Sequence, residues 1–203
     1  DVPGHRGPPL RHQASACWAL SGRAFAHIAD RGSRVVVRPV ATPDQPLASF
    51  AFAGNPTALT VSNDGLVVAV GCEDRTARLW HIEERRELRV LSGQGGPITE
   101  LCVTGLDGLA VTASDDRTLA VYEVATGRRV AWLPQPGRVL ELCCSPDASR
   151  VIARYDRRHP LLFDLQIERP AYARDAHRGQ VQDVAFGPEG QWLATAGRDG
   201  YVR

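Results

Sequence analysis

One aspartate recurs in the same position of five consecutive segments, and this repeat constrains the fold more than any other feature of the chain. Successive aspartates are 44, 42, 40 and 43 residues apart, and they are Asp30, Asp74, Asp116, Asp156 and Asp199. A nearly constant period of roughly 20–50 residues is typical of repeat architectures, in which each segment is one supersecondary unit packed against the next. We therefore expect the 203-residue chain to fold from five related units.

Each segment contains short β-rich runs and no helical periodicity of useful length. A segment opens with apolar residues three positions apart, as in Ile98-x-x-Leu101 and Val181-x-x-Val184. A turn of Asp, Asn, Gly, Pro or Ser follows, then a strand of small residues, the turn with the aspartate, and further apolar strands. Four strands in about 42 residues correspond to one blade of a β-propeller. The sequence predicts an all-β fold, a β-propeller of about five four-stranded blades with the last blade incomplete.

The repeats also resemble a known family. The best match runs from His177 through Val181-Gln182-Asp183-Val184 to Gly197-Arg198-Asp199-Gly200, and the segment Ala113–Thr118 is almost as good. With five such segments in register, the chain resembles the WD-repeat (Trp-Asp repeat, WD40) β-propeller family over about 190 of its 203 residues. The Trp-Asp dipeptide itself is absent, so the repeats are degenerate.

The resemblance implies a structural hydrogen-bond set in each blade. The set links a His before the first strand, a Ser or Thr on the second strand, the turn Asp, and a Trp on the third strand. Carried onto this sequence, the members retained are His177, Thr195 and Asp199 in the last repeat, Thr112 and Asp116 in the third, Asp74 and Trp80 in the second, and Asp30 and Asp156 in the first and fourth. Gln94 and Phe52 stand where two of the His residues are expected. We therefore expect apolar packing to hold these blades more than the polar set does.

The chain divides into a Pro/Gly-rich N-terminal extension, residues 1–12, and a WD-repeat propeller, residues 13–203. The repeats span about residues 13–50, 51–94, 95–135, 136–174 and 175–203. Because the last repeat ends inside its third strand, we expect a fragment of a larger propeller, seven-bladed by family analogy. Such an arc would expose blade faces and favour self-association through them.

Composition excludes several classes of function. The net charge is +1, and no apolar run approaches the length of a membrane span, so we expect neither nucleic-acid nor membrane binding. Five cysteines show no metal-ligand spacing and lie in apolar runs. They are expected to be small buried hydrophobes of a reducing compartment rather than disulfide partners, which suggests a cytoplasmic protein. All basic residues are arginine, which indicates GC-rich codons and a bacterial source.

The sequence contains no catalytic constellation that we can identify. Its six histidines form no H-E-x-x-H pair, and its cysteines form no C-x-x-C pair. The acidic pairs Glu73-Asp74 and Asp115-Asp116 are each followed by an arginine, so we interpret them as structural turns rather than calcium ligands. We expect no cofactor, no metal and no enzymatic activity.

The predicted function is a scaffold or sensor module in signalling that presents propeller loops to a partner protein or to another domain of its own chain. The resemblance implies that a peptide segment binds at the narrow top opening. The residues that would line it are Thr57, Glu73, Thr99, Asp115, Leu140, Tyr155, Gln182 and Arg198. The alternative is a propeller-fold enzyme that uses an acidic arc in the channel, formed by Glu100, Glu141 and Asp183.

Overall fold

A computed structural model describes most of the chain. The described residues are 17–18, 24–29, 34–52, 54–147, 149–156, 159–165, 169–172, 177, 179–187 and 190–203. The predicted N-terminal extension and Asp30 lie outside these residues. Within the described part, no helix is long and apolar enough to cross a membrane.

The described strands form successive antiparallel sheets, each folded from strands that are consecutive in the chain. The first sheet contains β1 (Cys17–Trp18), β2 (Ala24–Ala29), β3 (Arg34–Pro39) and β4 (Ala48–Ala51). The second contains β5 (Pro56–Val61), β6 (Val67–Cys72), β7 (Ala77–His81) and β8 (Arg86–Leu91). The third contains β9 (Ile98–Val103), β10 (Leu109–Ser114), β11 (Thr118–Glu123) and β12 (Arg129–Pro134). The fourth contains β13 (Val139–Cys144), β14 (Arg150–Tyr155), β15 (Leu161–Asp164) and β16 (Arg169–Tyr172), and the fifth contains β17 (Val181–Phe186) and β18 (Leu193–Gly197).

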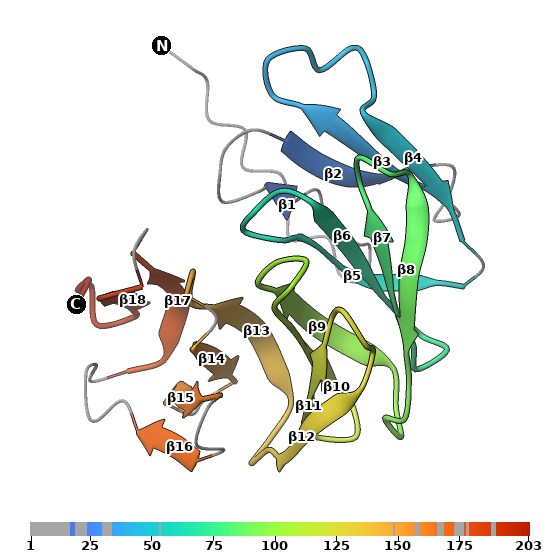
Figure 1. Cartoon of the computed structure of the whole chain (residues 1–203). Helices are drawn as coiled ribbons and strands as arrows, with labels where there is room; N and C mark the ends of the chain where they lie inside the picture. Colours follow the sequence, from blue (N-terminus) through green and yellow to red (C-terminus); the bar gives the residue numbers. More distant parts are fainter. Residues whose placement is uncertain are drawn as a thin grey trace.

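The sheets follow one another along an arc in chain order (Figure 1). The first strands of neighbouring sheets pack side by side: β1 with β5, β5 with β9, β9 with β13 and β13 with β17. The first strand of each sheet therefore lies at the inner side of the arc, as in a propeller blade. The prediction of an all-β fold of β-propeller type is confirmed.

The hydrophobic core consists of layers between neighbouring sheets. In β6 every residue is buried, and alternate side chains point to opposite faces. Val68 and Val70 pack towards the first sheet, whereas Val67 and Ala69 pack towards the third. A strand buried on both faces needs apolar residues at every position, and this explains the continuous run of small and β-branched residues in the middle strand of each repeat.

Close packing between the second and third sheets depends on Gly71. A Cβ atom at this position would lie 2.6 Å from Cγ2 of Ile98 and 3.2 Å from Cδ2 of Leu101. Both neighbours are buried, so they have little room to move. The missing side chain lets β6 approach β9, the first strand of the third sheet.

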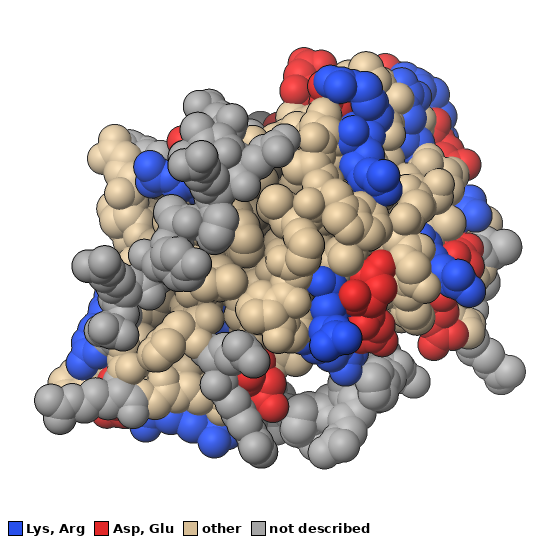
Figure 2. All heavy atoms as spheres, turned by 90° about the horizontal axis from the view of Figure 1, so that it is seen from below, with Lys and Arg blue, Asp and Glu red and all other residues tan. Residues whose placement is uncertain are grey.

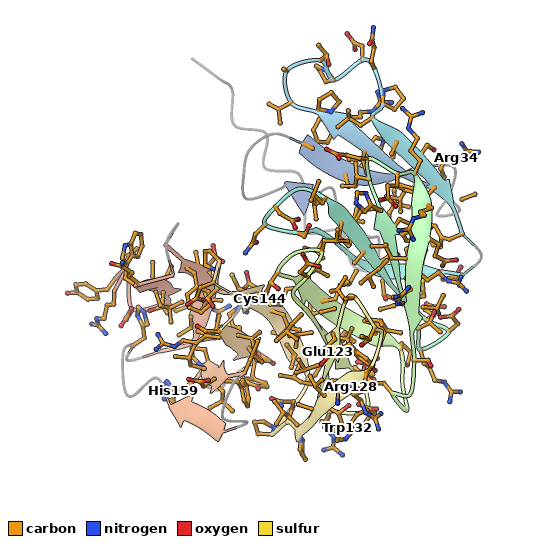
Figure 3. All side chains as sticks on the ribbon, viewed as in Figure 1. Arg34, Glu123, Arg128, Trp132, Cys144 and His159 are labelled. Carbon is orange, nitrogen blue, oxygen red and sulfur yellow. A yellow bond between two sulfur atoms is a disulfide. The ribbon has the colours of Figure 1, made fainter. Side chains whose placement is uncertain are left out.

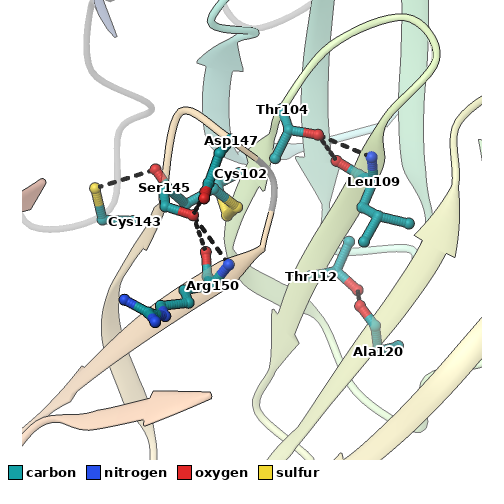
Figure 4. Close-up of a disulfide and its surroundings, with 10 residues drawn as sticks. Cys102, Thr104, Leu109, Thr112, Ala120, Cys143, Ser145, Asp147 and Arg150 are labelled. Atoms are coloured by element: carbon teal, nitrogen blue, oxygen red, sulfur yellow. Dashed lines mark hydrogen bonds between the residues drawn. A yellow bond between two sulfur atoms is a disulfide. The ribbon is translucent and has the colours of Figure 1, made fainter. Parts of the chain in front are cut away.

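Two of the cysteines form a disulfide, which corrects the expectation from the sequence. Cys102 on β9 is bonded to Cys144 on β13, and the bond links the third sheet to the fourth (Figure 4). The two residues are 42 positions apart, close to one repeat period, so consecutive first strands bring them together. Cys72 and Cys143 are free thiols. The cysteine pattern therefore no longer supports a reducing compartment.

The fourth strands β8 and β12 carry several exposed side chains. Trp132 on β12 is 37% exposed, and the guanidinium of Arg129 lies 4.6 Å from the centre of its ring. Glu123 and Arg128 form an ion pair near it at the same edge of the third sheet (Figure 3). On the face seen in Figure 2, basic and acidic groups lie beside one another without a large area of either sign.

Candidate functional site

A β-bulge interrupts the first strand of four consecutive sheets at the same position. In β5, Pro56 is paired with Cys72 and Ala58 with Gly71, so one residue is left without a partner position. The same shift occurs at the start of β9, β13 and β17. The extra residues are Thr57, Thr99, Leu140 and Gln182.

These four residues are the ones that the family resemblance placed at the top opening. A bulge removes one residue from the ladder and turns its side chain away from the regular alternation, which is why bulges are frequent beside functional sites. The sequence carries a sign of the bulge, because apolar residues three apart would point to opposite faces of a regular strand. The extra residue brings Ile98 and Leu101 into the same core layer.

A recess of about 220 Å³ lies where the second and third sheets meet. Its wall includes four of the predicted residues, namely Thr57, Glu73, Thr99 and Asp115. The remaining wall is formed by Pro56, Pro97, Ile98 and Arg138, the last of which precedes β13 of the fourth sheet. The structure therefore brings half of the predicted rim together around one recess.

Hydrogen bonds fix the two acidic turns at this recess. The amide of Glu73 donates to the carbonyl of Asn55 at 2.9 Å, and the amide of Asp115 donates to the carbonyl of Pro97 at 3.0 Å. The side-chain amide of Asn55 also donates to Glu73 Oε2 at 2.9 Å. Arg138 Nε lies 3.1 Å from Asp115 Oδ1 and forms an ion pair across the neighbouring sheets.

Hydrogen bonds also fix the side chains of the two bulge threonines, Thr57 and Thr99. The Thr57 hydroxyl donates to the carbonyl of Ile98 on the neighbouring sheet. The Thr99 hydroxyl lies 3.4 Å from the carbonyl of Ala113. The floor of the recess is therefore tied to both sheets, and its shape depends on the contact between them.

The other four predicted rim residues do not line this recess. Leu140 on the fourth sheet is half-buried, whereas Gln182 and Arg198 of the fifth sheet are exposed. Tyr155 is only 1% exposed, and its hydroxyl donates to Gln135 Oε1. The prediction that Tyr155 lines the opening is therefore wrong.

The register of the fourth sheet explains this error. Val139 is paired with Tyr155, as Ile98 is paired with Ser114 in the third sheet. Asp156 therefore corresponds to Asp115 rather than to Asp116, and its assignment to the structural hydrogen-bond set is corrected. The spacing from Asp116 to Asp156 is 40 residues, the shortest of the four spacings, and it indicates that Asp156 comes too early in its turn.

The structural set of the last repeat is brought together in the fifth sheet. The ring of His177 is fully buried, with Nδ1 2.9 Å from Asp199 Oδ1 and Nε2 2.8 Å from the Thr195 hydroxyl. The Asp199 carboxylate also accepts the backbone amide of Tyr201 at 3.3 Å. This set connects the segment before β17 to the middle of β18 and to the turn that follows it.

A glutamine replaces the histidine in the third sheet. The Thr112 hydroxyl donates to Gln94 Oε1 at 2.7 Å, and the Gln94 side-chain amide donates to the Thr118 carbonyl at 3.2 Å. Asp116 accepts the amide and the hydroxyl of Thr118 at 2.9 and 2.6 Å. Gln135 occupies the same position in the fourth sheet, which the sequence analysis missed, although it lies four residues before the first strand as Gln94 does.

The second sheet uses aromatic packing where the histidine is missing. The rings of Phe52 and Trp80 are 5.9 Å apart between centroids, and the ring of Phe50 is stacked on that of Trp80 at 5.6 Å. Asp74 still accepts the amide and the hydroxyl of Thr76, at 3.0 and 2.6 Å. Apolar contacts thus replace the polar network here, as expected for a degenerate repeat.

The acidic residues of the predicted channel arc lie directly after the bulges. Burial raises the pKa of Glu100 to about 7, and the carboxylate of Glu141 adds to this effect. Burial also raises the pKa of Glu141, although Arg154 Nε donates to its Oε2 at 2.7 Å. Asp183 is the third member and is exposed. Within the described part of the chain, no group of three His, Cys, Asp or Glu side chains is arranged to hold a metal ion.

A second recess, of about 430 Å³, lies at the first and second sheets and includes Leu47, Asp64 and Glu83. Asp64 is engaged in the fold, because its carboxylate accepts the Leu66 amide at 3.0 Å and the Leu106 amide of the third sheet at 2.9 Å. None of the predicted site residues lies there.

Comparison with known families agrees with this architecture. The family described as "WD domain, G-beta repeat" matches residues 45–81, which run from the turn before β4 through β7, and residues 169–203, which include β16, β17 and β18. The chain contains WD repeats at these two places. The WD repeats thus coincide with sheets whose first strands carry the bulges.

Two of the relatives are subunits by name, and a third is named for its association with an RNA. The chain is 24% identical over 153 residues to eukaryotic translation initiation factor 3 subunit I of Culex quinquefasciatus, which covers 67% of the chain and 46% of the relative. It is 26% identical over 142 residues to the U3 small nucleolar RNA-associated protein 15 homolog of Xenopus laevis, covering 68% of the chain and 27% of the relative. It is 30% identical over 98 residues to target of rapamycin complex subunit wat1 of Schizosaccharomyces pombe, covering 47% and 31%.

The chain therefore spans less than half the length of each of these relatives. All three come from eukaryotes, and they give no support to the bacterial source expected from the arginine content.

Proposed function

We propose that this chain is a non-catalytic protein-interaction module that binds an extended segment of a partner protein at the recess between its second and third sheets. The observation that carries the proposal is the coincidence of two bulge residues, Thr57 and Thr99, with one recess that contains both acidic turns. The names of two relatives, which denote a complex subunit and an initiation-factor subunit, support a partner protein in general.

The geometry favours binding over catalysis. A rigid wall held by backbone hydrogen bonds from two sheets is a suitable docking surface, because little ordering is needed when a partner binds. The residues of the alternative enzymatic arc do not favour a reaction, because Arg154 already neutralises Glu141. Protein interaction is therefore the single function that we propose.

The test is to select binders from a random-peptide display library on the purified chain and to measure their affinity for two matched variants. Thr99→Trp is expected to fill the recess and to abolish binding. Glu83→Trp, which places the same side chain at the second recess, is expected to leave binding unchanged.

Thermal unfolding of each variant establishes that it is folded. Asp115→Trp, at an exposed turn position, replaces Thr99→Trp if the latter unfolds. Selected peptides that bind Thr99→Trp and Asp115→Trp as tightly as the unsubstituted chain would refute the proposed site.

A further inference from the structure

We propose that the recess receives one cationic side chain of the partner, an arginine or a lysine, and that Arg138 is the intramolecular cation that this side chain displaces. This inference rests on the proposed function, and it specifies the chemistry of the partner at the same site.

The size of the recess limits which ligand it can hold. Its volume of about 220 Å³ is below the roughly 300–1,000 Å³ of pockets that enclose a whole small ligand. A recess of this size accommodates one side chain of an extended segment whose backbone lies along the rim. The remainder of the segment would contact the exposed turns on either side.

The chemistry of the wall also limits which side chain fits the recess. Pro56 and Pro97 are half-buried and give an apolar surface, whereas Ile98 is only 2% exposed and adds little to it. Glu73 and Asp115 stand at equivalent positions of two consecutive turns and add two carboxylates. An apolar surface below two carboxylates matches a long side chain with an aliphatic stem and a cationic head.

The two carboxylates differ in their present partners. Glu73 is held by the neutral side-chain amide of Asn55 at 2.9 Å, and among the described residues no cation forms an ion pair with it. Its negative charge therefore remains available at the rim. An anionic ligand would meet this charge directly, so the recess disfavours phosphate and carboxylate groups.

Asp115 is already paired with a guanidinium. Arg138 Nε lies 3.1 Å from Asp115 Oδ1, and both side chains are about half exposed, at 54% and 46%. Exposed ion pairs of this kind contribute little to stability, so they can be exchanged at low cost. The intramolecular contact shows that the carboxylate accepts a guanidinium in this geometry, and the exchange leaves Arg138 free to enter solvent.

The exchange of Arg138 for the partner's cation leads to a prediction that a merely acidic surface would not make. If Arg138 competes with the partner's cation, then Arg138→Gln should tighten binding by roughly 1.5- to fivefold, the range for releasing an exposed pair. Glu73→Gln and Asp115→Asn should each weaken binding by at least about fivefold. Glu84→Gln, at an exposed carboxylate of the β7–β8 turn, is the control and should have no effect.

The probe is N-acetyl-arginine N-methylamide, compared with the citrulline analogue, which has the same shape without the charge. Binding is followed by the amide chemical shifts of Thr57, Thr99 and Asp115. We expect saturable shifts with the arginine compound and at least about fivefold weaker binding of the citrulline compound. Equal binding of the two compounds, or unchanged affinity in Arg138→Gln, would overturn the inference.

Failure of this inference can be separated from failure of the proposed function. Selected peptides that lose binding on Thr99→Trp but tolerate replacement of every Arg and Lys by citrulline and glutamine would leave the docking site in place and overturn the cationic specificity. Peptides that ignore Thr99→Trp would overturn the proposed function itself.

Discussion

Replacing Glu100 by glutamine should stabilise the fold at alkaline pH and leave it unchanged at acidic pH. Glu100 follows the bulge of β9 and is largely shielded from solvent, which raises its pKa from the ordinary value of 4.5 to about 7. The carboxylate of Glu141 on the neighbouring first strand raises the pKa further, and Arg154 and Arg138 oppose the effect. The folded chain thus holds this proton more tightly than the unfolded chain does.

The sign and the size follow from this difference. Between pH 4.5 and about 7 the folded state binds more protons than the unfolded state, so the free energy of unfolding falls as pH rises through this window. Each pKa unit corresponds to about 1.4 kcal/mol. Allowing for partial exposure, ionised Glu100 costs about 2–3 kcal/mol above the window and nothing below it.

Urea unfolding of the unsubstituted chain and of Glu100→Gln at about pH 4 and about pH 8 measures the effect. We expect Glu100→Gln to be more stable by about 2–3 kcal/mol at the higher pH, which corresponds to a Tm higher by roughly 4–12 °C. Glu83→Gln, at an exposed carboxylate, should change little at either pH. A stabilisation that is equal at both pH values, or absent at the higher one, would refute the reasoning.

Three further predictions concern the contacts between sheets. Gly71→Ala should destabilise the chain by about 1–3 kcal/mol through overpacking, whereas Gly137→Ala, where a Cβ meets nothing within 4 Å, should not; urea unfolding of both variants decides this. The double variant Cys102→Ser, Cys144→Ser should lose about 2–4 kcal/mol, because the disulfide closes a loop of 42 residues, and adding reductant should lower the stability of the unsubstituted chain but not of the variant. His177→Ala leaves the partners of a fully buried ring unpaired, so amide exchange in β18 should accelerate as the fifth sheet loses about 1–3 kcal/mol; unchanged exchange there would show that the ring is dispensable.

The fold could be predicted from the sequence because its signal is repeated. A single aspartate turn is weak, but the same turn at a nearly constant period fixes the length of the unit, and the apolar pattern fixes its strands. The strand that is buried on both faces was visible as a continuous run of small and β-branched residues, of which Val67–Cys72 is the clearest example.

The site could be predicted only in part, for two physical reasons. The bulges that present Thr57 and Thr99 are marked in the sequence only by apolar residues three rather than two apart, and that spacing does not show which way the extra side chain points. The fourth repeat is offset by one position in the turn, so Tyr155 was placed at the rim although it ends a strand and is buried. The disulfide was missed because pairing between sheets depends on which first strands are neighbours, and sequence spacing alone does not give this.

The most direct test of the account is an amide chemical-shift map of the chain with one selected peptide. We predict that the largest changes lie at Thr57, Thr99 and Asp115, with smaller changes along the two acidic turns. Changes that cluster instead around Asp64 and Glu83 at the second recess, or around Trp132 on the outer edge of the third sheet, would contradict the proposed binding site.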